Sequence, residues 1–122
     1  MKDTANISLA KQIECVFWEI SQELLHLSSG LIFIHIRNNI VGKFGVKHDP
    51  IESVNGKWEG TEKGLTAKQI NAFREMAVES LAYKHWTHGE IQFEFALKKD
   101  LLYTSVTFES NYNMANRLKD QS

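Results

Sequence analysis

The chain has 122 residues, of which 43% are hydrophobic and 24% charged, and its formal net charge is −1. This size and composition are those of one globular domain, residues 1–122, and exclude a disordered chain. Proteins that bind nucleic acid through its phosphates usually carry a basic surplus, so the charge argues against nucleic-acid binding. The longest purely apolar run, residues 31–34, is too short to span a bilayer, and we see no signal peptide. We therefore expect a cytoplasmic protein that contacts no membrane.

Apolar side chains recur every three or four residues between positions 8 and 28, which predicts an amphipathic helix. Gly30 follows, and glycine suits the left-handed position that ends many helices. The single cysteine, Cys15, has apolar neighbours, and we interpret it as a small core residue rather than a catalytic thiol. The buried face of the helix is expected to contain Ile13, Val16, Phe17, Ile20, Leu24 and Leu27.

Two strands are predicted next, over residues 31–36 and 40–46. The first is rich in β-branched and aromatic residues, which favour a strand. Asn38 and Asn39 lie between the two strands, and asparagine adopts the positive φ angles of a tight hairpin turn.

This turn sets an expected register, with Phe33 opposite Phe44 and Leu31 opposite Val46. The three isoleucines of the first strand then point to the opposite face, so that strand is apolar on both sides. Such a strand is usually covered on both faces. We expect a loop or another protein to supply the second cover.

Residues 47–64 form a long connection, and long connections are often functional. Asn55 and Gly56 could form a short hairpin inside it. Trp58 has two interpretations: it folds back to cap the core, or it is exposed and anchors an interface. Two acidic residues follow it, Glu59 and Glu62.

A second helix is predicted over residues 67–84. Thr66 and Gln69 have the spacing of a capping box, and Leu65 and Ile70 have that of a hydrophobic staple. Its buried stripe is expected to contain Ile70, Phe73, Ala77 and Leu81.

A second strand pair is predicted over residues 90–108, because apolar and polar residues alternate along residues 90–97. We place the turn at Lys99 and Asp100. This is not a strong turn pair, and a loop one residue longer is the alternative. The expected partners are Leu97 with Leu102, Phe95 with Thr104, Phe93 with Val106, and Ile91 with Phe108. The opposite, polar face carries Glu90, Glu94 and Tyr103 and is free to meet a partner.

A short helix over residues 111–119 is predicted to close the chain. The element order is then α-β-β-α-β-β-α. This order predicts an α+β fold in which helices pack on one face of a four-stranded antiparallel sheet.

The sequence contains no motif that names a reaction. His85 and His88 have a spacing that two metal ligands can use, but the His-Glu-x-x-His pattern of zinc hydrolases is absent. We interpret the pair as part of a polar turn. No nucleophile elbow and no phosphate-binding glycine motif occurs. We therefore predict a protein that is not an enzyme and uses no metal or cofactor.

Trp86, the strand 91–97 and a second strand that closes at Phe108 resemble the YezG-like family of bacterial immunity proteins, or antitoxins. Arg117 falls roughly where that family has an arginine after its last strand. The resemblance implies a cytoplasmic protein that binds and blocks a cognate toxin domain, often a nuclease. The acidic residues Glu59, Glu62, Glu90 and Glu94 would then mimic phosphate against a basic toxin site.

The element order is also similar to that of roadblock-like domains. That similarity implies an alternative function, a small dimeric regulatory or scaffold module. The doubly apolar strand 31–36 would suit a homodimer in which a twin covers the sheet.

Overall fold

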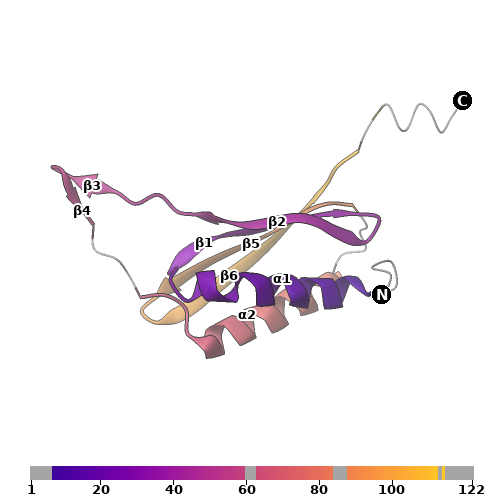
Figure 1. Ribbon diagram of the computed structural model, residues 1–122, viewed down its shortest axis with the longest axis horizontal. Helices are drawn as coiled ribbons and strands as arrows, with labels where there is room; N and C mark the ends of the chain where they lie inside the picture. Colours follow the sequence, from indigo (N-terminus) through magenta and orange to yellow (C-terminus); the bar gives the residue numbers. More distant parts are fainter. Residues whose placement is uncertain (1–6, 60–62, 84–87, 113, 115–122) are drawn as a thin grey trace, which may run out of the picture.

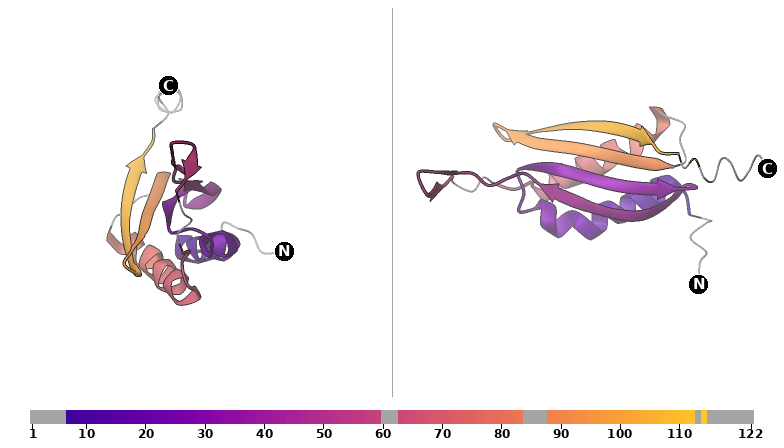
Figure 2. Two further views of the ribbon diagram at one scale, coloured as in Figure 1. Left: turned by 90° about the vertical axis from the view of Figure 1, so that its left-hand side faces the viewer. Right: turned by 90° about the horizontal axis from the view of Figure 1, so that it is seen from above.

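The computed structural model describes residues 7–59, 63–83, 88–112 and 114. The elements follow in the order α1 (Leu9–Leu24), β1 (Ser29–Arg37), β2 (Ile40–His48), β3 (Ser53–Val54), β4 (Lys57–Trp58), α2 (Ala67–Ser80), the 3-10 turn η2 (Leu81–Tyr83), β5 (Gly89–Lys98) and β6 (Leu101–Ser110). Four strands form an antiparallel sheet in the order β2-β1-β5-β6, and both helices lie on one of its faces (Figures 1 and 2). The predicted α+β fold is confirmed. The predicted final helix, 111–119, lies mostly outside the described residues.

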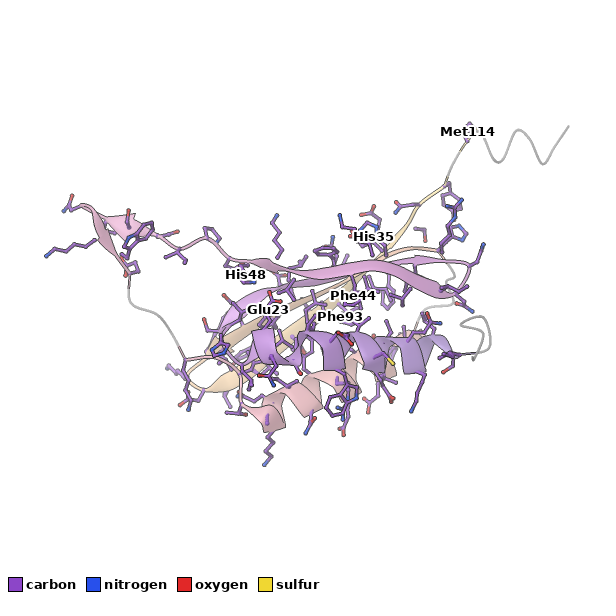
Figure 3. All side chains as sticks on the ribbon, in the orientation of Figure 1. Glu23, His35, Phe44, His48, Phe93 and Met114 are labelled. Carbon is purple, nitrogen blue, oxygen red and sulfur yellow. The ribbon has the colours of Figure 1, made fainter. Side chains whose placement is uncertain are left out.

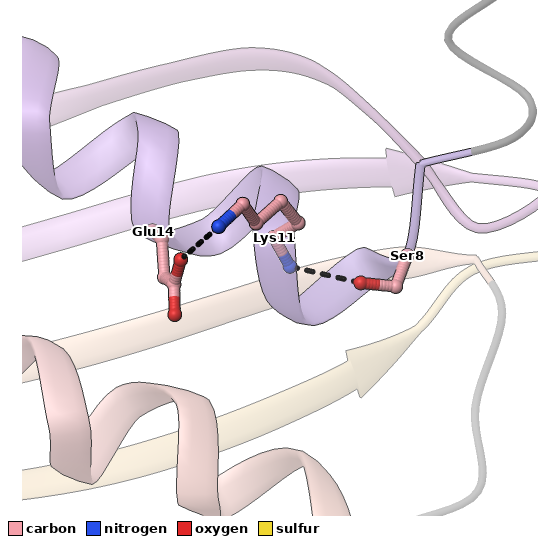
Figure 4. Close-up of polar contacts among 3 residues, drawn as sticks. All are labelled: Ser8, Lys11 and Glu14. Carbon is pink, nitrogen blue, oxygen red and sulfur yellow. Dashed lines mark hydrogen bonds and ion pairs between the residues drawn. The ribbon is translucent and has the colours of Figure 1, made fainter.

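Helix α1 begins where Ser8 accepts a hydrogen bond from the Lys11 backbone N–H at 3.2 Å, and Lys11 forms an ion pair with Glu14 at 3.4 Å (Figure 4). The helix ends earlier than expected. The Leu65 N–H lies 3.2 Å from the carbonyls of both Leu24 and Leu27, so an incoming loop satisfies carbonyls at this end. The prediction that Gly30 ends the helix is wrong, because Gly30 lies inside β1.

The core sits between the two helices and the inner face of the sheet. The Phe17 and Phe73 rings of the helices meet edge to face at 5.1 Å, and Phe93 of β5 lies 5.9 Å from Phe17. The predicted face of α1 is buried apart from Leu27, which packs on the core while partly exposed. Cys15 is exposed, so its interpretation as a core residue is wrong. It lies about 200° around the helix from Ile13 and therefore points away from the sheet.

Helix α2 begins with the predicted capping box: Gln69 N–H donates to Thr66 Oγ1 at 3.1 Å, and Thr66 N–H donates to Gln69 Oε1 at 2.9 Å. The Gln69 side chain also donates to the carbonyl of Asp100 at 3.1 Å, which ties the helix to the β5–β6 turn. Ile70, Phe73 and Ala77 are buried as predicted. Leu81, expected in the same stripe, is only partly buried in η2, because the α-helix ends at Ser80.

The β5–β6 hairpin has the predicted register along its whole length, from Leu97 opposite Leu102 to Ile91 opposite Phe108. The predicted two-residue turn at Lys99 and Asp100 is confirmed. Lys99 and Asp100 adopt φ angles of 52° and 64°, as a tight hairpin turn requires.

The β1–β2 hairpin does not keep its predicted register. Phe33 lies opposite Gly45 rather than Phe44, and Leu31 lies opposite Lys47 rather than Val46. The predicted turn at Asn38-Asn39 is present, but a bulge shifts the pairing by one residue between Ile34 and Ile36.

Two valines explain the bulge. Val41 and Val46 both pack on the core, yet they are five residues apart. Alternating side chains of a regular strand put residues five apart on opposite faces, so an extra residue between them is needed. The bulge also lets the Phe33 ring cover Gly45, where an added Cβ would come within 2.8 Å of the ring.

The sheet face opposite the helices is called the open face here. On β1 it carries the half-buried Leu31 and Phe33 and the exposed His35. We expected a second layer over this strand, but among the described elements none lies on the open face (Figure 2). Leu31 and Phe33 are therefore shielded chiefly by neighbours within the sheet.

Candidate partner-binding site

Strands β3 and β4 form a separate hairpin that projects from one end of the body (Figure 1). We call residues 49–59 the arm. Asn55 and Gly56 form its turn with φ angles of 53° and 79°, which confirms the hairpin predicted there. Trp58 pairs with Ser53, and a further hydrogen bond of 2.9 Å joins Glu59 N–H to the Glu52 carbonyl.

The arm exposes its apolar side chains. Trp58 is 71% exposed, because its cross-strand neighbour Ser53 is too small to cover the ring. Ile51 is 73% exposed and Val54 57%. The interpretation that Trp58 folds back onto the core is therefore wrong, and its alternative, an exposed tryptophan, is correct. Exposed apolar side chains gathered on one projecting element are typical of an interaction site.

The base of the arm is held by the C-terminal end of α1 and the start of β1. His48, the last residue of β2, faces Glu23 of α1 across 2.5 Å (Figure 3). Ser29 donates to Asp49 at 2.5 Å. Pro50 then follows, and proline cannot continue a hydrogen-bonded ladder. The chain thus leaves the sheet at a defined point.

The returning segment is also fixed at α1. A Cβ added to Gly64 would lie 1.9 Å from the Leu25 carbonyl oxygen, so only glycine permits this approach. Leu65, the next residue, is 2% exposed and joins the core. The connection that contains the arm therefore starts and ends against the same helix end.

The predicted binding residues of the sheet divide into two groups on the open face. Glu94 and Tyr103 lie toward the end from which the arm leaves, and Tyr103 is 52% exposed. The Lys98 ammonium lies 5.4 Å from the centre of its ring. Glu90 lies at the other end. Its side chain is only 16% exposed and binds His35 at 2.8 Å and Gln92 at 2.9 Å.

The arm adds Glu59, which is exposed beside Trp58, whereas Glu62 lies outside the described residues. The predicted residues therefore form no single cluster. Trp58 and Glu59 share the arm, Glu94 and Tyr103 share the nearby part of the open face, and Glu90 is held by its own neighbours.

The described residues contain no group of three or more His, Cys, Asp or Glu side chains that could hold a metal. His85 is not described, and the His88 ring packs against Tyr112 at 5.6 Å. Two His–Glu pairs lie in the described part of the chain, His35 with Glu90 on the open face and His48 with Glu23 at the base of the arm. The exposed apolar side chains of the arm offer a surface for binding.

Sequence reasoning missed a second exposed tryptophan. Trp18 of α1 is 65% exposed, and the Arg74 guanidinium of α2 lies 5.1 Å from the centre of its ring. Trp18 directly follows buried Phe17 and falls off the apolar stripe of α1, which is the signal that predicts exposure. The pair lies on the helical layer, away from the open face.

Comparison with known proteins adds no relative: no family model, curated protein or solved structure matches the chain. In the described part of the molecule, neither helix combines the length and apolar character needed to cross a membrane.

Proposed function

We propose that this protein works by binding another protein through its arm, and that the partner is a toxin domain that it blocks. The exposed Trp58 on an ordered, projecting hairpin is the observation that carries the proposal. Tryptophan is among the residues that most often dominate the binding energy of an interface. The resemblance of residues 86–108 to YezG-like immunity proteins directs the choice of a toxin as the partner.

The geometry of the arm favours binding because the hairpin is already formed. Its turn residues have the positive φ angles of a tight turn, and its ladder extends to Glu52 and Glu59. A preorganised segment loses less conformational entropy on association than a disordered one. Contacts of Trp58 with a partner therefore contribute to affinity without first offsetting the entropy cost of ordering the arm.

The charges near the arm favour a basic partner. Glu52 and Glu59 flank the short strands, and Glu94 lies on the neighbouring open face. A nuclease that binds phosphate presents basic groups, and acidic side chains complement them. Glu90 is bound to His35 and Gln92, so it contributes through the overall field rather than as a mobile contact.

The test begins with a search for a toxin gene next to this one, and then co-expresses this protein with the toxin domain found there. The absence of any such neighbour would count against the proposal. The unmodified protein should protect growth, and Trp58→Ala should weaken binding by about 30-fold, which corresponds to about 2 kcal/mol. Trp18→Ala is the matched control, because it removes an exposed tryptophan elsewhere and should preserve binding. Titration calorimetry measures both variants.

Two results would contradict the proposal. One is growth arrest despite abundant, folded wild-type protein. The other is equal affinity for the toxin domain in the Trp58→Ala and wild-type proteins. The alternative, a dimeric regulatory or scaffold module, predicts self-association with no protection from a toxin.

A further inference from the structure

The two edges of the main sheet differ in how they are protected. The β2 edge carries two glycines and two lysines in addition to the bulge, features that discourage pairing with another strand. The Gln12 side chain also occupies backbone groups near the turn. It accepts from Val41 N–H at 2.7 Å and donates to the Asn39 carbonyl at 2.9 Å.

The β6 edge has none of these protections. It is a ten-residue strand that pairs regularly with β5, and it contains no glycine, proline or lysine. Because its hairpin has a two-residue turn, alternate residues direct their N–H and C=O groups away from β5. These residues include Leu102, Thr104 and Val106, and no backbone group elsewhere in the described chain bonds to them.

The core also continues to this edge. Leu102 and Val106 point to the helical side of the sheet and pack on the core, but both remain partly exposed. Figure 2 shows β6 at the free margin of the sheet. An added strand would bury more of these side chains while satisfying the outward backbone groups.

We propose that β6 pairs antiparallel with β6 of a second copy, with the two-fold axis at Ser105. The two four-stranded sheets then join into one continuous sheet, and the helices of both copies lie on the same face. This surface is separate from the arm, so the inference goes beyond the proposed function and does not depend on it.

The sequence of β6 is self-complementary about Ser105, which favours a second copy over an unrelated strand. On the helical side, Thr104 faces Val106 of the second copy, and Leu102 faces its Phe108. On the open face, Tyr103 faces Thr107 of the second copy. Leu102 and Phe108 form an apolar pair, and Tyr103 and Thr107 both carry a hydroxyl group. Thr104 and Val106 are both β-branched and similar in size, so they pack side by side in a sheet.

The test is a disulfide across the axis. Ser105 would face itself in a non-hydrogen-bonded pair with Cα atoms roughly 4.5 Å apart, a separation that a disulfide spans. In a Cys15→Ser background, mild oxidation of Ser105→Cys should give a covalent dimer of twice the 14.0 kDa chain mass. Thr107→Cys is the matched control, since it lies on the same strand and face but would meet Tyr103.

A second measurement uses the protein without introduced cysteines, under reducing conditions. The wild-type chain should sediment as a dimer, and Ser105→Lys should reduce it to a monomer because two lysines would meet at the axis. The control Ser53→Lys, on the arm, should remain dimeric. A wild-type monomer at every concentration, or equal cross-linking of the Ser105→Cys and Thr107→Cys proteins, would overturn the proposal.

Discussion

The β1–β2 and β5–β6 hairpins have the same turn but different pairing. Asn38-Asn39 and Lys99-Asp100 both adopt φ angles of 52° and 64°. From the second turn the strands pair in one register to their ends, whereas from the first turn the register shifts by one residue after two residue pairs. A turn therefore sets the register of a hairpin only over the part of both strands in which that register places the apolar side chains on the core face.

The patterns of the two hairpins explain the difference. In β5 and β6 every second residue faces the core without interruption. In β2 the core positions include both Val41 and Val46, which no regular strand can place on one face. The bulge reconciles them, and it also leaves β2 a poorer edge for pairing than β6.

The largest expected effect comes from deleting one residue in each hairpin. Deleting Ser105 from regular β6 would turn Val106 and Phe108 to the open face and cost roughly 5 kcal/mol or more of unfolding free energy. Deleting Gly42 from the bulge would remove the extra residue and keep the pairs on both sides, at a cost of about 1 kcal/mol or less. Urea unfolding followed by circular dichroism measures both.

A similar loss in the two deletion variants would refute the comparison. It would mean that the residues around Gly42 hold β2 in place by contacts other than the register.

The sequence predicts the elements and the core of this molecule well. The spacing of apolar residues identifies the buried faces of α1 and α2, and strict alternation identifies the β5–β6 register. The predicted register of β1 and β2 was wrong because it was extended from the turn residues alone, and these residues carry no information about a bulge farther along the strand. The odd spacing of Val41 and Val46 is visible in the sequence. It predicts a bulge only once both side chains are known to face the core.

The candidate site is less predictable, because exposure depends on tertiary contacts. Trp58 was expected either to fold back or to be exposed, and its neighbours in sequence do not decide between these states. The tertiary structure decides it: the arm projects from one end of the body, and Trp58 is 71% exposed (Figure 1). Trp18 shows the reverse case, where helical periodicity alone predicts exposure.

A matched pair of core substitutions tests how deeply each hairpin is buried. Phe93→Ala should lower the unfolding free energy by about 4 kcal/mol, because Phe93 is 0% exposed and contacts two other rings. Phe44→Ala, on the β2 edge, should cost about 1 kcal/mol, because its ring is already 36% exposed. Chemical denaturation gives both values, and equal costs would contradict the view that β2 contributes less to the core than the inner strand β5 does.

The smallest effect, and the sharpest comparison, comes from exchanging the first turn residues. Both positions have φ of 52°, where a lysine is strained and an asparagine is not. Lys99→Asn should raise the unfolding free energy by about 0.5–1 kcal/mol, and Asn38→Lys should lower it by a similar amount. Thermal and urea unfolding resolve such changes. If the two changes had the same sign, the turns would be held by contacts of their side chains rather than by backbone conformation, and the shared φ angles would no longer explain why both turns form.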